Sequence, residues 1–137
     1  MKKKIFFLVL FIQSVCIFSD GYDSINMKSI REQIKKAGFG GDLIISYVGN
    51  INRKYDIFYI TRYVETEYNV RVYNALIIFE DLKLRGYYLG LPIEPKLENS
   101  VIVFPCDKSY GNQIIIEGEI PKQIRIDGEL FYFQLSD

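Results

Sequence analysis

Residues 55–89 read YDIFYITRYVETEYNVRVYNALIIFEDLKLRGYYL, and this stretch decides the fold. It divides into three runs rich in β-branched and aromatic residues, namely Tyr55–Glu65, Val70–Glu80 and Lys83–Leu89. Runs of this kind are typical of β-strands, and the short polar breaks between them suit antiparallel neighbours. Parallel neighbours need a connection of a dozen or more residues, which excludes a doubly wound parallel sheet.

Shorter strands are expected on both sides of this stretch. The turn at Asp127-Gly128 predicts a hairpin near the end of the chain, because both residues accept the positive φ angles of a type I′ turn. The longest loops are expected at Leu91–Ser100 and Cys106–Asn112. The outer strands predicted from composition are Leu43–Val48, Val101–Phe104, Gln113–Glu117, Gln123–Ile126 and Leu130–Leu135.

One helix is expected before the strands. Met27, Ile30, Ile34 and Ala37 recur at helical spacing, and Gly38 stands where a left-handed residue would end the helix. The sequence therefore predicts a mostly β (α+β) fold. We expect an antiparallel meander that forms a small sandwich or a partly open barrel, with this one N-terminal amphipathic helix packed on it.

The beginning of the chain has the pattern of an export signal. Lys2, Lys3 and Lys4 precede an apolar run that continues to Phe18 and is followed by Ser19. We expect residues 1–19 to be a cleaved signal peptide and residues 20–137 to form a single β-rich domain. The protein is then periplasmic or secreted, rather than a lipoprotein at Cys16 or a protein held by a retained anchor. Its contact with the membrane is through the signal peptide alone, before cleavage.

Composition argues against several kinds of chemistry. The chain has 17 basic and 17 acidic residues, so removal of the basic signal leaves a mildly acidic domain and no nucleic-acid partner is expected. It contains no His and no Trp, which removes the commonest general base and the commonest zinc ligand. No cofactor and no metal are expected. Cleavage would leave Cys106 as a lone thiol, either buried or available for pairing between chains.

Tyrosines supply the candidate binding face. Tyr55, Tyr59 and Tyr63 alternate along one strand and so share one of its faces, and Tyr87 and Tyr88 lie on a neighbouring run. Tyrosine is favoured at recognition surfaces because it offers a large contact area at a low entropy cost. The alternative is that these rings cover the half-buried face of a sheet, with their hydroxyls at its edge.

Three functions fit these observations. We expect an exported, non-enzymatic binding protein that recognises another protein through the tyrosine-rich face, as an inhibitor, an immunity-like protein or an accessory factor. A carbohydrate- or small-ligand-binding domain of the envelope is one alternative, with the tyrosines stacking on ligand rings. The other is an envelope hydrolase that uses paired carboxylates such as Glu117 with Glu119 or Glu65 with Glu67.

Overall fold

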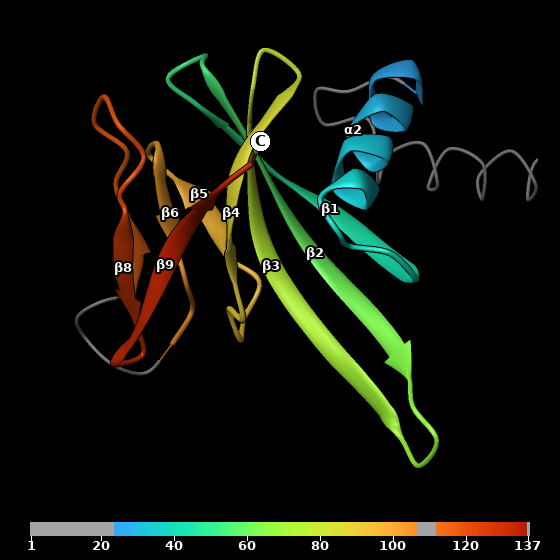
Figure 1. The fold of residues 1–137 in the computed structure, drawn as a ribbon. Coiled ribbons are helices and arrows are strands. Elements are labelled where there is room, and N and C mark those ends of the chain that lie inside the picture. The colour runs from blue at the N-terminus through green and yellow to red at the C-terminus, as the bar shows by residue number, and fades with distance from the viewer. Residues whose placement is uncertain (1–23, 107–111, 137) are drawn as a thin grey trace, which may run out of the picture.

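A computed structural model describes residues 24–106 and 112–136 of the chain. Six strands form the main sheet in the order β1-β2-β3-β4-β9-β8, and three short strands form a second sheet in the order β5-β6-β7 (Figure 1). Every pair of neighbouring strands is antiparallel. The strands are β1 (Asp42–Ile51), β2 (Tyr55–Glu65), β3 (Val70–Glu80), β4 (Lys83–Leu89), β5 (Lys96–Glu98), β6 (Val101–Val103), β7 (Gln113–Ile114), β8 (Gln123–Ile126) and β9 (Glu129–Leu135).

For the described residues, the mostly β class with one helix and an antiparallel sheet is confirmed, and the sheet does not close into a barrel. The strands β2, β3, β4 and β8 begin and end at the predicted residues. The expected signal peptide, residues 1–19 with Cys16, lies outside the described residues, as does the 107–111 part of the loop after Cys106.

The predicted loop Leu91–Ser100 is wrong in its second half, because Lys96–Glu98 forms β5 and pairs with β6. A three-residue strand with two charged side chains has no recognisable pattern in the sequence. Its pairing depends on a turn at Asn99-Ser100, whose φ angles are 49° and 64°. Asp127-Gly128 has φ angles of 53° and 83°, and these confirm the predicted type I′ turn.

The helix α2 spans Ser24–Lys36, and Gly38, which follows its last turn, has a φ of 106°. The Phe39 amide donates to the Ile34 carbonyl at 3.3 Å, and the Gly38 amide donates to the Lys35 carbonyl at 3.0 Å. This pair of hydrogen bonds is the Schellman ending, which needs a left-handed residue and so favours glycine. The ending turns the chain back so that Phe39 packs in the same apolar cluster as Ile34.

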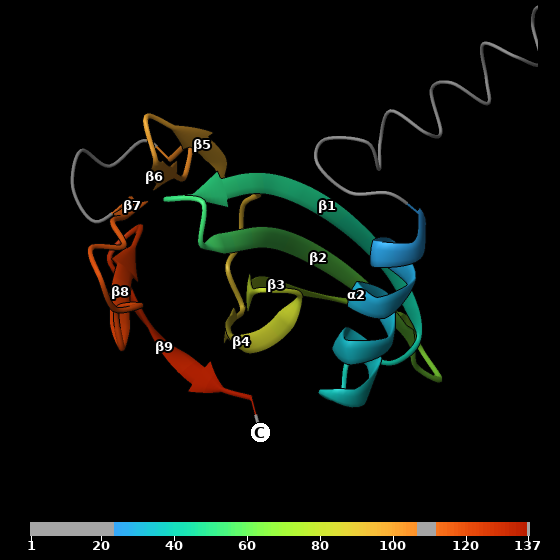
Figure 2. The same cartoon turned by 90° about the horizontal axis from the view of Figure 1, so that it is seen from above.

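The inner halves of β2 and β3 are buried on both faces. The helix-side cluster contains Met27, Ile30 and Ile34 of α2 and, from the sheet, Phe58, Ile60, Ala75, Ile77 and Phe79. The opposite cluster contains alternate residues of the same strands, such as Ile57 and Ile78, packed with residues from the small sheet and from β8 and β9. Figure 2 shows α2 on one side of the main sheet and β5 to β8 at its other end.

Gly49 allows the small sheet to approach β1. It lies next to a bulge in β1, between Tyr47 and Gly49 in the pairing with β2. A Cβ atom at this position would stand 2.6 Å from Cδ2 of Leu97 in β5. A larger residue here would require the Leu97 side chain to move, and the φ of 150° at this position also favours glycine.

Candidate functional site

Three of the five tyrosines of the expected binding face are buried. Tyr55, Tyr59 and Tyr88 are 4%, 5% and 0% exposed, and all three belong to the cluster beneath the small sheet. A ring enclosed in this way cannot contact a partner or stack on a sugar. The expectation of a binding face on these three residues is therefore corrected. They are core residues, because the small sheet and β8–β9 cover the face that they share.

Their hydroxyl groups connect β2 and β4 of the main sheet to the segment between β4 and β8. Tyr55 donates to the Gly118 carbonyl at 3.2 Å, Tyr59 to the Leu91 carbonyl at 2.9 Å and Tyr88 to the Pro121 carbonyl at 2.5 Å. Burial, together with the negative charge of Glu94, raises the pKa of Tyr59 to about 12. Burial also raises the pKa of Tyr88. The hydroxyls of Tyr59 and Tyr88 therefore remain neutral donors at physiological pH.

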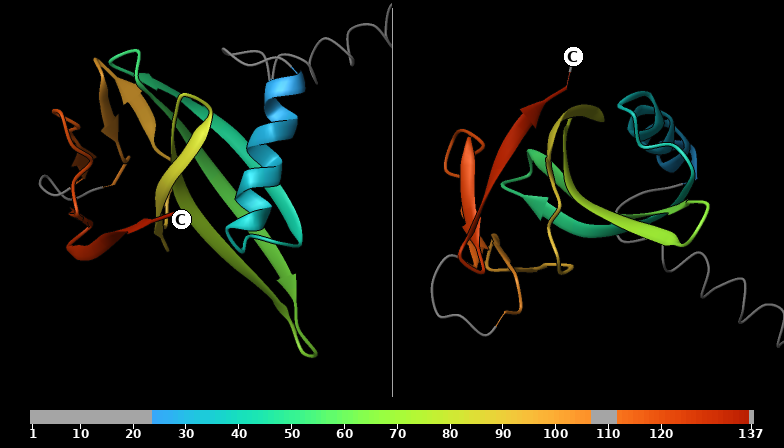
Figure 3. Two further views of the ribbon diagram at one scale, coloured as in Figure 1. Left: turned by 45° about the horizontal axis from the view of Figure 1, so that its top comes forward. Right: turned by 60° about the horizontal axis from the view of Figure 1, so that its bottom comes forward.

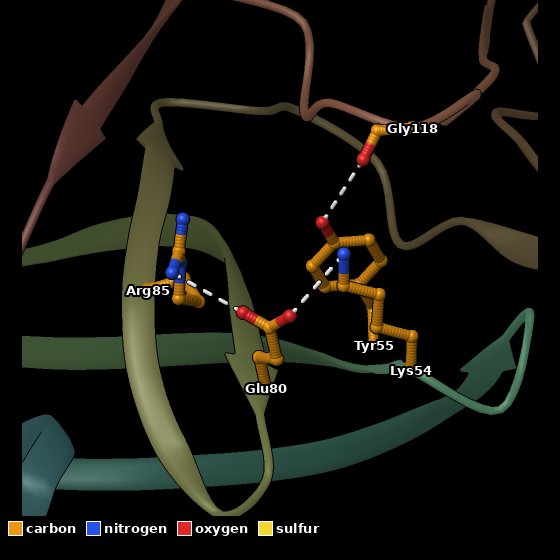
Figure 4. A network of polar contacts seen from close by, with 5 residues as sticks. All are labelled: Lys54, Tyr55, Glu80, Arg85 and Gly118. Carbon is orange, nitrogen blue, oxygen red and sulfur yellow. Dashed lines mark hydrogen bonds and ion pairs between the residues drawn. The ribbon is translucent and has the colours of Figure 1, made fainter.

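Ion pairs surround the Tyr55 end of this arrangement (Figure 4). Glu80 pairs with Lys54 at 3.4 Å and with Arg85 at 3.2 Å. The Lys54 ammonium also lies 5.1 Å from the centre of the Tyr55 ring. Hydrogen bonds to Tyr55 and to Glu80 raise the pKa of Lys54. The contacts join the ends of β2, β3 and β4, and we assign them a structural role.

The other two predicted tyrosines lie apart from this group. Tyr87 is half-buried on the helix side of the sheet, where its ring meets Phe39 edge to face at 5.0 Å. Tyr63 is 40% exposed near the outer end of β2. The five tyrosines therefore do not form one face, and Tyr63 is the member of the set that the structure leaves open to a partner.

Tyr63 belongs to an exposed apolar surface that sequence reasoning did not assign. The outer ends of β2 and β3 project beyond the rest of the sheet (Figure 3). Pairing places Tyr63 opposite Val72 and Glu65 opposite Val70, so these side chains share one face, and Ile44 joins them from β1 through its pairing with Thr61. We call this surface, with the tip residue Tyr68, the hairpin surface; its members are Ile44, Tyr63, Tyr68, Val70 and Val72.

The turn at the tip of the hairpin is closed by hydrogen bonds between its own polar groups. The Thr66 amide donates to the Asn69 carbonyl at 2.7 Å, and the Thr66 hydroxyl donates to the Asn69 side-chain oxygen at 2.7 Å. The Asn69 amide donates in return to the Thr66 hydroxyl at 3.1 Å. Between these two residues Tyr68 is 89% exposed. A large aromatic ring thus stands in water on a turn that is already ordered.

The carboxylate pairs and the thiol are placed as follows. Glu117 and Glu119 are exposed on either side of Gly118, and Glu65 and Glu67 are exposed at the hairpin tip. Burial is one way in which a site separates the pKa values of two carboxylates, and these four side chains are exposed. Cys106 is a free thiol, half-buried against the cluster beneath the small sheet, with its sulfur 3.5 Å from the Phe104 carbonyl oxygen.

No family model, curated protein or solved structure matches this chain. Within residues 24–106 and 112–136, no three side chains of His, Cys, Asp or Glu are grouped to hold a metal ion. In the same residues there is no helix long and apolar enough to cross a membrane.

Proposed function

We propose that this chain is an exported, non-enzymatic binding protein that recognises another protein through the hairpin surface. The observation that carries the proposal is the projecting end of β2 and β3, where Tyr63, Val70 and Val72 are 40%, 55% and 52% exposed on one face. Grouped apolar side chains in water are a marker of protein interaction sites. Export through residues 1–19 would place this surface in the periplasm or in the medium.

The hydrogen-bonded turn at the tip of the hairpin supports the same proposal. Binding costs free energy for every side chain and loop that must be ordered, and an ordered turn reduces that cost. Tyrosine is also enriched among the few residues that supply most of the binding energy in protein interfaces. Tyr68, held on the Thr66–Asn69 turn, combines both properties.

We also infer that the rest of the fold serves as the support for this hairpin. The main sheet and the small sheet would form an incomplete sandwich, with α2 on the outer face. The hydrogen bonds that the Tyr59 and Tyr88 hydroxyls donate connect the sheet to the segment between β4 and β8. Because its inner half is packed on both faces, the β2–β3 hairpin can extend its outer half into solvent without folding back onto the rest of the domain.

The experiment compares two tyrosine variants of the full chain, each carrying a tag at its end and expressed in its own source. In the first, Tyr63→Ser and Tyr68→Ser remove aromatic area from the hairpin surface. In the second, Tyr132→Ser removes an aromatic ring that is 58% exposed on β9. We expect the wild-type protein and the β9 variant to co-purify with the same partner, and the hairpin variant to lose it while it melts at the wild-type temperature.

Mass spectrometry of the captured chains decides the outcome. Capture of the same partner by the hairpin variant would overturn the proposed surface, and recovery of all three proteins without any partner would overturn the protein-binding function. The mass of the purified protein also tests cleavage after Ser19. Retention of residues 1–19 would overturn the proposed export by a cleaved signal.

A further inference from the structure

A second surface lies on the helix side of the sheet, away from the hairpin surface. The last turns of α2, the first half of β4 and the end of β9 enclose an open groove of about 680 Å³. Figure 2 shows these three elements close together, with the end of β9 and α2 both next to β4. The residues that line the groove are Gln33, Lys36, Ala37, Lys83, Leu84, Arg85, Tyr87, Leu135 and Ser136.

The lining of the groove is cationic and apolar. Among the described residues that line it, Lys36, Lys83 and Arg85 are basic and none is acidic. The charge of α2 extends this pattern, because the helix carries four basic residues, Lys28, Arg31, Lys35 and Lys36, against the single acid Glu32. The field of such a cluster attracts negatively charged ligands.

The backbone around the groove is already hydrogen-bonded. The Gln33 side-chain amide donates to the Leu82 carbonyl at 2.7 Å, and its oxygen accepts from the Leu84 amide at 3.0 Å. The Ser136 amide donates to the Arg85 carbonyl at 3.0 Å. A ligand therefore does not add a strand to β4 at these residues, and the side chains must recognise it. Carboxylates suit the lysines and Arg85, and apolar groups suit Leu84, Tyr87 and Leu135.

The spacing of the cations favours an extended peptide over a small anion. Lys83 is the first residue of β4, and Arg85 is the extra residue of a bulge in the pairing of that strand with β3. Lys36 reaches the groove from a different element, so the positive charge is spread along the groove between α2 and β4. Arg85 keeps further N–H donors beyond its contact with Glu80 at 3.2 Å.

We propose that this groove binds an extended acidic segment of a partner polypeptide. Carboxylates of the segment pair with Lys83, Arg85 and Lys36, and its apolar side chains lie on Leu84, Tyr87 and Leu135. The surface is separate from the hairpin surface, because Leu84 and Tyr87 pack with the helix-side cluster. Binding in the groove therefore does not depend on the hairpin surface.

Fluorescence anisotropy of a fluorescein-labelled Glu-Leu-Glu-Leu-Glu peptide tests the groove. We expect the wild-type protein to bind it, and K36E/K83E to bind it at least tenfold more weakly. The matched variant K96E/K122E makes the same change in charge at two exposed lysines that lie outside the groove and outside α2, and we expect it to bind within twofold of the wild-type protein. A Glu-Gly-Glu-Gly-Glu peptide should bind several-fold more weakly than the leucine peptide.

Four results would overturn the proposal. They are no binding to the wild-type protein, equal losses in the two double variants, tight binding of tripolyphosphate with the same dependence on Lys36 and Lys83, and self-association of the wild-type protein that K36E/K83E abolishes. The third would define a general anion site, and the fourth would make a second copy the occupant. If K36E/K83E does not fold, NMR decides: the peptide must shift the wild-type amide signals of residues 83–87.

Discussion

At the scale of single residues, the polar contacts of the core are hydrogen bonds from tyrosine hydroxyls and not ion pairs. Tyr59 and Tyr88 each have a buried ring, and each hydroxyl donates a hydrogen bond to a carbonyl of the segment between β4 and β8. A hydrogen bond of this kind contributes about 1 kcal/mol to stability. Both bonds require a neutral hydroxyl. We therefore expect the stability of the fold to decrease at alkaline pH.

We predict that the free energy of unfolding decreases between pH 10 and pH 12. The pKa of Tyr59 is raised to about 12 from 10.0, so the unfolded state releases its proton at lower pH than the folded state does. The stability from this difference is present below pH 10 and is lost as the pH rises through the folded pKa. Each such tyrosine contributes a slope of up to ~1.4 kcal/mol per pH unit. Urea denaturation at pH 9, 10 and 11 measures the slope.

The variant Tyr59→Phe separates the share of Tyr59 from that of other groups. It should cost about 1 kcal/mol at pH 7, because the Leu91 carbonyl loses its donor, and it should reduce the alkaline slope. Tyr132→Phe, at an exposed position, should leave both quantities unchanged. An unchanged alkaline slope in Tyr59→Phe would show that Tyr59 does not ionise in this way.

The sequence predicts the faces of these residues but not their burial. Alternation in β2 places Tyr55, Tyr59 and Tyr63 on one face, and the structure agrees for all three. Nothing local shows that the small sheet covers the first two and leaves Tyr63 exposed. Coverage depends on where residues distant in the chain, such as Ile102 and Phe104, come to lie. The exposure of Tyr63 and the burial of Tyr55 and Tyr59 therefore could not be predicted from the strand itself.

At the scale of elements, Gln33 protects the edge of β4. Its side-chain amide bonds to the Leu82 carbonyl and the Leu84 amide, which is how one peptide group of a neighbouring strand would bond. Pairing of β4 with β9 covers Gly86 to Tyr88, so the residues before Gly86 need another partner. Unpaired strand edges invite association with other chains, and α2 supplies this protection through a single residue.

We predict that Gln33→Met destabilises the protein by about 1–2 kcal/mol. Methionine keeps the size of the side chain but leaves the Leu84 amide and the Leu82 carbonyl without their partner. Hydrogen exchange should become faster at the Leu84 amide and remain unchanged at the Ile77 amide in the neighbouring strand. Glu32→Met, at an exposed helix position, is the control. Equal exchange at Leu84 in both variants would contradict the role of Gln33.

Elements were predictable wherever local chemistry specifies them. The long strands β2, β3 and β4 follow from dense β-branched and aromatic runs, and the Asp127-Gly128 turn follows from its residues. Strand β5 was missed, and β7 is shorter than predicted, since only Gln113–Ile114 pairs. Both depend on pairing with β6 more than on their own composition. The role of Gln33 had no signal either, because its partners are about 50 residues away.

At the scale of the whole molecule, the β2–β3 hairpin is buried along its inner half and exposed to solvent along its outer half. The pairing of β2 with β3 is continuous from Tyr55–Glu80 to Glu65–Val70. Its inner half is buried on both faces, and its outer half carries the exposed residues of the hairpin surface. The ladder is the same along its length, so any difference in local stability comes from burial.

We predict that hydrogen exchange reports this difference within the single hairpin. Amides of residues 57–60 and 75–79 should exchange only by global unfolding, because opening them exposes both apolar clusters. Amides of residues 63–72 should exchange through local opening, at least a hundredfold faster, because little apolar area is exposed when they open. The exchange rates should rise where the burial of β2 ends, between Ile60 and Tyr63. Uniform protection along the hairpin would mean that its outer end is covered in solution, and the hairpin surface would then not be free to receive a partner.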